Sequence, residues 1–352
     1  MINQPNDISA KKRISIILLW VIIGLLVLII AISGTLMALV LIGKNNLLDN
    51  SNASIITPES MVETEGNDGK TIYYKGQKYI FNENITSLLF MGIDKENLSD
   101  TSETFGANGQ ADVLVLIALD TSNGKMKAIP ISRDTMVDVN QYSISGQYIG
   151  ISKEQICLSY SYGDGGKLSC ENTVTSVSRL LYGMPINSYV ALDLKGIKIL
   201  NDSIGGVTVT VDKDIDLFDK HLKKGDTVTL KGEYALKYIR GRDQVSLEAN
   251  NDRMSRQKNY IRAFYKSTIK MTKKDITTPV KMYNRISKYK FSDLSVADIS
   301  YLTQCVLLNR STDMTFASIS GKNVAGEKYV EFYPDYEALY ELVIDTFYKP
   351  AS

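Results

Sequence analysis

The stretch Asp112–Asp120, DVLVLIALD, is apolar at every position between its two terminal aspartates. Largely apolar runs also precede and follow it, ITSLLFMGID at Ile85–Asp94 and KMKAIPISRDT at Lys125–Thr135. A strand with one face in water alternates apolar and polar residues, whereas a continuous apolar run is typical of a strand covered on both faces. These runs therefore predict strands of a sheet that carries helices on both faces.

Helical and extended patterns alternate through the rest of the chain. Helices are expected at residues 173–182, 194–206, 230–242, 275–308 and 336–347, and in a long amphipathic segment that begins at Asn251 or Asp252 and runs through Tyr265. Further strands are expected at residues 188–194, 207–211, 313–319 and 329–334, and a hairpin at 71–82. This alternation indicates the α/β class, with a central sheet flanked by helices on both faces.

The N-terminal region has the pattern of a membrane anchor. Residues 14–43 are thirty positions without a charged residue, and about 20 apolar residues suffice to cross a bilayer as a helix. Lys11, Lys12 and Arg13 stand immediately before this segment, and positive flanking charge stays on the cytoplasmic side. A cleaved signal peptide is the alternative, but its apolar region would be about half as long.

Four parts of the chain follow from this pattern. They are a cytoplasmic tail at residues 1–13, a transmembrane anchor at 14–43, a polar stalk at 44–70 and an extracellular domain at 71–352. The stalk is rich in Asn, Ser, Asp and Glu and lacks apolar periodicity, as segments without a packed core do. We expect a single-pass protein of the cell membrane with its N-terminus in the cytoplasm.

Composition excludes several classes of function. The 40 basic and 39 acidic residues leave a net charge of +1, so no global field favours nucleic acid as a partner. The only histidine, His221, lies in a polar segment, which excludes a Ser-His-Asp triad, a Cys-His dyad and a histidine zinc site. An enzyme with this composition depends on carboxylates, arginines and a hard metal ion.

The three cysteines predict one disulfide. Cys157 and Cys170 flank the glycine-rich segment CLSYSYGDGGKLSC, and an extracellular compartment permits a disulfide between them. Cys305 lies in an apolar, helix-like stretch and is expected to be a buried free thiol. No Cys-x-x-Cys pair is present to suggest a metal site.

Charged residues gather where the predicted strands begin or end. Asp94 closes the first apolar run, Asp112 opens the second, and Arg133 and Asp134 close the third. Paired carboxylates hold Mg²⁺, which in turn binds substrate phosphates. A single aspartate at a strand end is more often a structural cap, so it is the combination that suggests a site.

The window Tyr238–Gln257, YIRGRDQVSLEANNDRMSRQ, adds positive charge of one kind. It holds four of the ten arginines of the chain, Arg240, Arg242, Arg253 and Arg256, and no lysine. A solvated helix face would instead mix lysine with glutamate at four-residue spacing. Because the guanidinium fork matches phosphate in a bidentate way, the window predicts an anionic, phosphate-bearing ligand.

Seven ordered motifs between Ile85 and Phe264 resemble the LytR-CpsA-Psr family. They are LLFMGID, GQADVLVLIALD, IPISRDTMV, SYSYGDGG, DSIGGVTVTV, GEYALKYIRGR and NDRMSRQ. The resemblance implies a central, mostly mixed β-sheet between helices, with the core motifs within residues 85–264. It further implies transfer of a glycopolymer, such as teichoic acid or capsule, from a polyprenyl-pyrophosphate carrier onto peptidoglycan in a Gram-positive cell wall.

The resemblance also assigns roles to residues. Asp94 and Asp112 correspond to metal-linked aspartates for Mg²⁺ or Mn²⁺. The residues implied to bind the pyrophosphate are Arg133, Arg240, Arg242, Arg253, Arg256 and Gln257. The implied catalytic set is Asp94, Asp112, Arg133, Asp134, Arg240 and Arg242, and any of the three aspartates could accept the proton of the attacking hydroxyl.

The chain departs from the family pattern at four positions. Gln110 stands for an arginine, Ser132 for a proline, Asn250 for an aspartate and Cys157 for an asparagine. The loss of one arginine and one carboxylate predicts weakened activity. Two alternatives to the transferase therefore stay open: a polyprenyl-pyrophosphate hydrolase, and a protein that binds or regulates the lipid-linked polymer without turnover.

Overall fold

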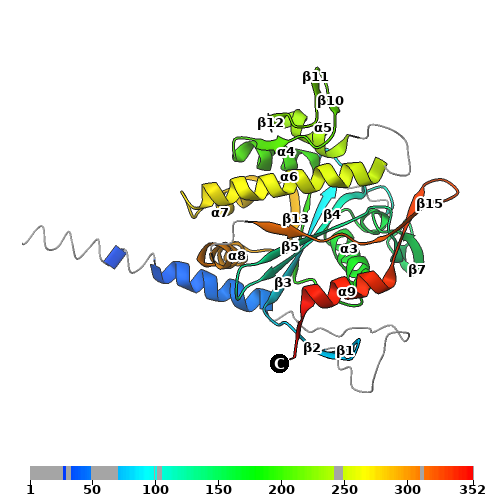
Figure 1. Ribbon diagram of the computed structural model, residues 1–352, viewed down its shortest axis with the longest axis horizontal. Coiled ribbons are helices and arrows are strands. Elements are labelled where there is room, and N and C mark those ends of the chain that lie inside the picture. The colour runs from blue at the N-terminus through cyan, green and yellow to red at the C-terminus, as the bar shows by residue number, and fades with distance from the viewer. Residues whose placement is uncertain are drawn as a thin grey trace, which may run out of the picture.

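The computed structural model describes residues 27–28, 33–48, 70–98, 100, 105–241, 249–309 and 313–351, and for residues 249 and 250 the backbone alone. Its centre is a six-stranded sheet with the strand order β13-β8-β3-β4-β5-β14 (Figure 1). These strands are β3 (Ile85–Ile93), β4 (Ala111–Asp120), β5 (Met126–Ile131), β8 (Ser188–Leu192), β13 (Lys290–Ser292) and β14 (Met314–Phe316).

The direction of the strands makes the sheet mixed, as predicted. Strand β4 runs antiparallel to both β3 and β5, whereas the β3–β8 and β5–β14 pairs are parallel. The three apolar runs are confirmed as β3, β4 and β5, and they are neighbours in the sheet. Because β3 and β5 both oppose β4, they end at the edge of the sheet where β4 begins.

Helices cover both faces of the sheet (Figure 1). One face packs against α2 (Leu158–Ser161), α3 (Lys167–Leu180) and α9 (Tyr336–Phe347). The other face packs against α4 (Leu194–Ser203), α6 (Ala249–Thr272), α7 (Thr278–Arg285) and α8 (Val296–Leu308). Helix α5 (Gly232–Arg240) packs against α4 and α6, so it lies outside the sheet layer.

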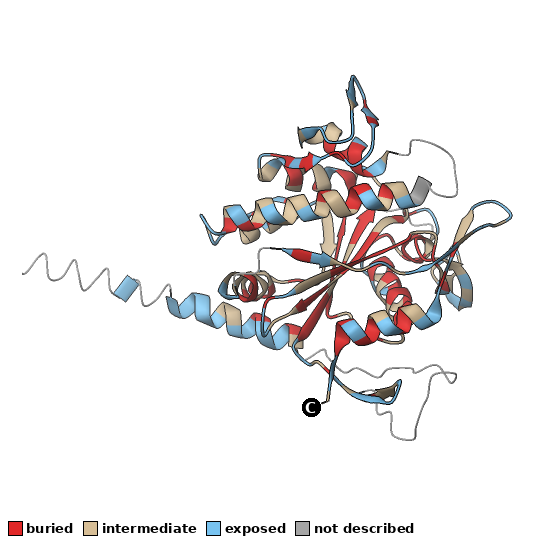
Figure 2. Cartoon of the chain, in the orientation of Figure 1, coloured by how far each residue is buried: buried red, intermediate tan, exposed pale blue. Residues whose placement is uncertain are grey.

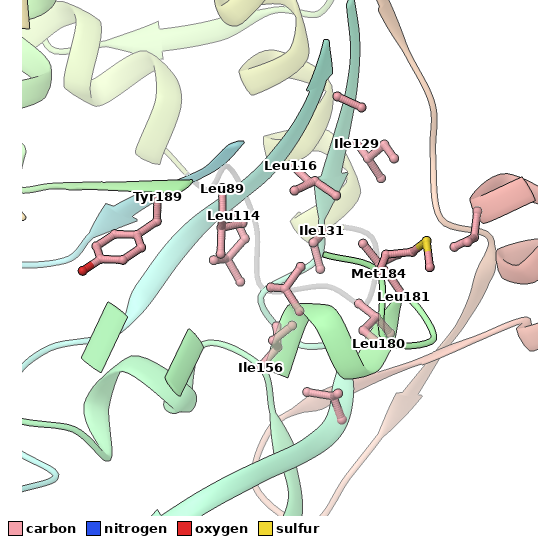
Figure 3. Packing of buried hydrophobic residues seen from close by; sticks show 14 of the residues in the cluster. Leu89, Leu114, Leu116, Ile129, Ile131, Ile156, Leu180, Leu181, Met184 and Tyr189 are labelled. Atoms are coloured by element: carbon pink, nitrogen blue, oxygen red, sulfur yellow. The ribbon is translucent and has the colours of Figure 1, made fainter. Parts of the chain in front are cut away.

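The two faces are packed to different degrees. Leu89 of β3 and Leu116 of β4 point to the α3 and α9 face and are 0% exposed, and Figure 3 shows them in one cluster with Leu180 and Leu181. On the face toward α6, the β4 residue Val115 is buried, but Val113 and Ile117 on either side of it are only partly buried. The central strands are largely buried (Figure 2), and the partly buried apolar residues of β4 lie on the α6 face.

Small antiparallel sheets surround the centre. They are formed by β1 (Thr71–Tyr74), β2 (Gln77–Phe81) and β17 (Tyr348–Pro350); by β6 (Met136–Tyr142) and β7 (Tyr148–Gln155); by β9 (Val207–Thr210) and β12 (Thr227–Leu230); by β10 (Ile215–Leu217) and β11 (Lys220–Leu222); and by β15 (Gly321–Ala325) and β16 (Val330–Pro334). The hairpin predicted at residues 71–82 is confirmed as β1 and β2.

Two helix predictions need correction. Residues 275–308 are not helical throughout, because the short strand β13 lies between α7 and α8 and pairs with β8. Three residues are too few to show a periodic pattern, and only the long-range pairing makes them a strand. Helix α6 begins at Ala249 and continues past Tyr265 to Thr272.

The N-terminal helix packs on the domain. Residues 33–48 are helical, so residues 44–48, predicted as the start of the polar stalk, continue that helix. Leu47 is buried against the core, and a Cβ on Gly43 would lie 2.3 Å from the carbonyl oxygen of Ala297 in α8. Within the described ranges, no helix has the length and apolar content to cross a membrane. Much of the predicted anchor, and residues 49–69 of the stalk, lie outside the described residues.

The predicted disulfide between Cys157 and Cys170 is wrong. All three cysteines are buried free thiols, as expected for Cys305 alone. The chain between Cys157 and Cys170 is not an open loop but contains α2 and the start of α3. These helices direct Cys170 into the core, whereas the Sγ of Cys157 lies 3.9 Å from the Oε1 of Gln110.

Replacing Leu116 with alanine is expected to lower the free energy of unfolding by about 2–5 kcal/mol, since the cavity left in the closely packed face cannot collapse fully. Urea denaturation of the full chain, followed by circular dichroism, measures the change. Leu308→Ala is the matched control: Leu308 is 71% exposed in α8, so its truncation should cost less than about 0.5 kcal/mol. A Leu116→Ala protein as stable as the wild type would contradict the placement of β4 at the centre of the core.

Candidate functional site

A cavity of about 460 Å³ lies at the edge of the sheet where β3 and β5 end and β4 begins. Its charged lining residues are Asp94, Asp112, Arg133, Glu233, Lys237, Arg240 and Arg253. Its apolar lining residues are Val113, Phe218, Leu236 and Ile239, and Gly241 and Gln257 complete it. The cavity thus unites the charged clusters at the strand ends with the arginine window of α5 and α6.

A β-bulge brings Asp112 into this cavity. Gly92 pairs with Val113, but the next residue, Ile93, pairs with Ala111, so Asp112 is the extra residue between them. Asp94 follows immediately, and its backbone N–H donates to the carbonyl of Gln110 at 3.0 Å. Bulges bend a strand and re-aim its side chains, which explains why two aspartates from neighbouring strands line one cavity.

Arg133 is held by two hydrogen-bond acceptors and a second nearby carboxylate. Its guanidinium forms an ion pair with Asp112, donates to the Oε1 of Gln110 at 2.5 Å, and lies 3.5 Å from the Oδ1 of Asp134. The side chain is mostly buried, at 16% exposed, so its orientation is fixed before any ligand binds. Asp134 supports this arrangement without lining the cavity.

The thiol of Cys157 lies next to this network, at the oxygen of Gln110. Burial raises the pKa of Cys157 to about 11, so the thiol is protonated and neutral at physiological pH. Two of the departures from the family pattern, Gln110 and Cys157, are therefore in contact with each other. Gln110 has a definite use, because it is an acceptor for Arg133.

Arg240 reaches the cavity from the last residue of α5. One of its guanidinium nitrogens donates to the Oδ1 of Asp94 at 2.6 Å, and both side chains are about half exposed, at 48% and 43%. An exposed pair of this kind contributes little to stability, roughly 0–1 kcal/mol. The pair can therefore open to receive an anion at small cost.

The remaining residues of the arginine window divide into two roles. Arg253 is buried and lines the cavity. Arg256 does not line it: its guanidinium donates to the carbonyl oxygens of Tyr238, at 3.2 Å, and of Gly241. Gln257 both lines the cavity and donates to the carbonyl of Ile239 at 3.1 Å.

These contacts satisfy carbonyl groups at the C-terminal end of α5, which have no partner inside the helix. They hold in place the end of the helix that carries Arg240. Arg242, also predicted to bind the pyrophosphate, lies outside the described residues, as does the side chain of Asn250.

Pattern reasoning missed part of the lining. Glu233 and Lys237 belong to the same face of α5 as Arg240, because residues four and seven apart share a helix face, and the helix itself was predicted. That spacing could have identified both residues. Phe218 had no such signal, since the β10–β11 hairpin that carries it was not predicted.

The two carboxylates fit a hard metal ion. Asp94 and Asp112 each use one oxygen toward an arginine, and the structure gives the second oxygen of each no hydrogen-bond partner among the described residues. No group of three or more His, Cys, Asp and Glu side chains is arranged around a metal site in the described ranges. Two carboxylates are the usual protein share for Mg²⁺ that completes its shell with water and substrate phosphates.

Comparison with known proteins places this geometry in a family. The LytR_cpsA_psr family model matches residues 54–342. The polyisoprenyl-teichoic acid–peptidoglycan teichoic acid transferase TagV of Bacillus subtilis is 35% identical over 184 residues, which are 50% of this chain and 42% of that protein. The corresponding TagU of Bacillus cereus is 30% identical over 156 residues, 44% of each chain. The chain thus spans less than half the length of these curated relatives.

A solved structure agrees with the sequence comparison. The crystal structure of B. subtilis TagV aligns with a TM-score of 0.58 and 27% identity, covering 75% of this chain and 97% of that one. The family match extends over most of the chain and includes every described residue of the cavity. The chain therefore belongs to the LytR-CpsA-Psr family.

Proposed function

We propose that the chain is a phosphotransferase that moves a glycopolymer from a polyprenyl-pyrophosphate carrier onto peptidoglycan in a Gram-positive cell wall. The observation that carries this proposal is the cavity itself, in which Asp94, Asp112, Arg133, Arg240 and Arg253 surround one space. The arrangement suits a pyrophosphate with a bound cation. Relatives that share the family are named as teichoic acid transferases.

The proposed reaction exchanges one phosphorus–oxygen bond for another. A hydroxyl of peptidoglycan attacks the phosphorus attached to the sugar, a phosphodiester forms, the bond to the bridging oxygen breaks, and polyprenyl phosphate leaves. The hydroxyl proton passes to a carboxylate, and Asp94 and Asp112 are the candidates, because Asp134 is turned toward Arg133 and Gln155 outside the cavity. Arg133, Arg240 and Arg253 donate to the phosphate oxygens on which charge develops.

Asp94 and Asp112 are the residues that would hold Mg²⁺ or Mn²⁺. A bound metal ion would neutralise part of the negative charge of the pyrophosphate. Arg133 and Arg240, which pair with these aspartates, keep the two carboxylates oriented toward the cavity.

The looser face of the sheet supports binding of the lipid. Val113 lines the cavity, and Val113 and Ile117 of β4 are partly buried on the face toward α6, with the buried Val115 between them. Separation of α6 from the sheet along these residues would accept an apolar chain that extends from the pyrophosphate. The polyprenyl group is therefore proposed to lie between the sheet and α6.

The location in the cell is also proposed, on the basis of sequence. Thirty uncharged residues at 14–43 after a basic cluster suit a single-pass membrane anchor with the domain outside. Helical residues 33–48 pack on α8 through Gly43 and Leu47. This contact would hold the domain close to the membrane, where the carrier lipid is found.

Arg240→Ala is expected to reduce the transfer rate by about 10²–10³-fold, because one donor to the developing charge is lost. Its stability should change by less than about 1 kcal/mol, as the pair with Asp94 is half exposed. The measurement is formation of phosphodiester-linked product from a polyprenyl-pyrophosphate-linked sugar and peptidoglycan. Arg262→Ala is the matched control, since Arg262 is an exposed arginine of α6 that stacks on Phe316.

The product identifies which reaction takes place. If free sugar phosphate is released at the same rate with and without peptidoglycan, the protein is a hydrolase and not a transferase. Retention of the lipid without any product would show a binding protein. If the Arg240→Ala variant keeps full activity, Arg240 does not take part in the proposed reaction.

Removal of divalent metal with EDTA should lower the transfer rate by at least about tenfold, and added Mg²⁺ should restore it. The physical reason is that pyrophosphate charge would then face the carboxylates of Asp94 and Asp112 without a cation between them. Protein dialysed against chelator-free buffer serves as the control. An unchanged rate in EDTA would exclude the proposed metal.

The charge deficit at position 110 is proposed to slow the reaction. The double variant Gln110→Arg, Cys157→Asn is expected to transfer about tenfold faster than wild type, because it adds a guanidinium beside Arg133. Gln110→Arg alone should gain less, since it removes an acceptor of Arg133 and leaves only a buried thiol next to the new charge. Initial transfer rates of the three proteins test this, and a double variant no faster than wild type would show that this charge is not limiting.

A further inference from the structure

The tip of the β10–β11 hairpin places an exposed aromatic ring at the cavity. Leu217 pairs with Lys220, so Phe218 and Asp219 form a two-residue turn. Phe218 is 62% exposed and yet lines the cavity beside Lys237. An exposed large apolar side chain is informative when it borders a binding site.

The backbone at Phe218 makes this placement unfavourable for stability. Its φ of 52° is in the left-handed region, where a bulky residue is strained and where glycine is the usual choice in a two-residue hairpin turn. Burial does not offset the strain, because the ring stays mostly in solvent. Strained residues of this kind collect at functional sites.

The surroundings of the ring are aromatic and cationic. The ring of Tyr234 meets Phe218 edge-on, with centroids 5.4 Å apart. The Nζ of Lys237 lies 5.6 Å from the centre of the Phe218 ring, and the Nζ of Lys220 lies 4.7 Å from that of Tyr234. The cluster thus combines a flat apolar surface with two ammonium groups.

The acidic neighbours are already engaged. Glu233 forms an ion pair with Lys198, and Asp219 accepts the hydrogen bond of the Tyr234 hydroxyl. Within the described part of the chain, neither Lys220 nor Lys237 takes part in an ion pair with a carboxylate. The two lysines are therefore available to an anionic ligand.

Helix α5 sets the distance between this cluster and the arginines. Lys237 precedes Arg240 by three residues, which is about 4.5 Å along the helix axis at a rise of about 1.5 Å per residue. Both side chains line the same cavity. A ligand whose phosphate is held by Arg240 thus has its next chemical group at Lys237 and Phe218.

From this geometry we propose that Phe218, Tyr234, Lys220 and Lys237 form a platform for the first sugar units of an anionic glycopolymer. The ring C–H groups of a sugar pack on the electron-rich face of an aromatic side chain, and the lysines attract phosphate groups of the polymer. This proposal rests on the proposed function of the cavity. It adds a subsite that distinguishes the carrier lipid with sugar from the carrier lipid without sugar.

Binding to two lipids tests the platform. The probes are polyprenyl pyrophosphate without sugar and the same lipid bearing a disaccharide with a phosphate on its outer sugar, titrated calorimetrically into the full chain in detergent micelles. The wild type should prefer the sugar-bearing lipid by about two- to tenfold, the worth of one aromatic contact. Phe218→Gly should lose that preference, and Phe218→Tyr should keep it.

The variants are chosen so that misfolding cannot imitate the result. Glycine suits the turn better than phenylalanine does, so Phe218→Gly should be at least as resistant to urea as the wild type. Tyr329→Ala, which truncates a 71% exposed ring outside the cavity, should keep the full preference for the sugar-bearing lipid.

Each outcome bears on a different claim. An unchanged preference in Phe218→Gly would overturn the platform while leaving the proposed function intact. Equal weakening for both lipids would mean that Phe218 contacts the lipid, which also overturns it. A wild-type chain that binds neither lipid would contradict the proposed function itself and the platform with it.

Discussion

The pairing of β4 with β3 and β5 is the constraint on which the rest of the structure depends. Since both neighbours run opposite to β4, their ends and its beginning share one edge of the sheet. A bulge at that edge turns Asp112 toward the same space as Asp94, and Arg133 follows the end of β5. Burial of the apolar strands on both faces fixes their register, so the core determines where the charged groups meet.

The electrostatics of the site follow from the proximity of these charged groups at one edge of the sheet. Arg133 with Asp112, and Arg240 with Asp94, form two ion pairs that differ in burial. The Arg133 pair is largely enclosed and has Gln110 as a further acceptor, so it acts as a fixed part of the wall. The Arg240 pair is half exposed, and it is the part of the site that can rearrange around an anion.

Support of Arg240 comes from the next helix along the chain. Arg256 and Gln257 on α6 bind carbonyl groups at the end of α5. The motif implies that Arg256 binds the ligand, but in the structure Arg256 instead holds the end of the helix that carries Arg240. Arginine suits this task because its several fixed donors can reach two carbonyls at once.

The sequence alone determined most of the central strands, most of the helices, the family and most of the charged residues that line the cavity, because long apolar runs and ordered motifs are local signals. Residues that act through long-range contacts were decided only by the tertiary structure. The helices between Cys157 and Cys170 separate the two thiols, and packing of α6 on α5 turns Arg256 away from the cavity. Phe218 reaches the cavity through a hairpin of three-residue strands, which are too short for any periodic pattern and exist because they pair and pack.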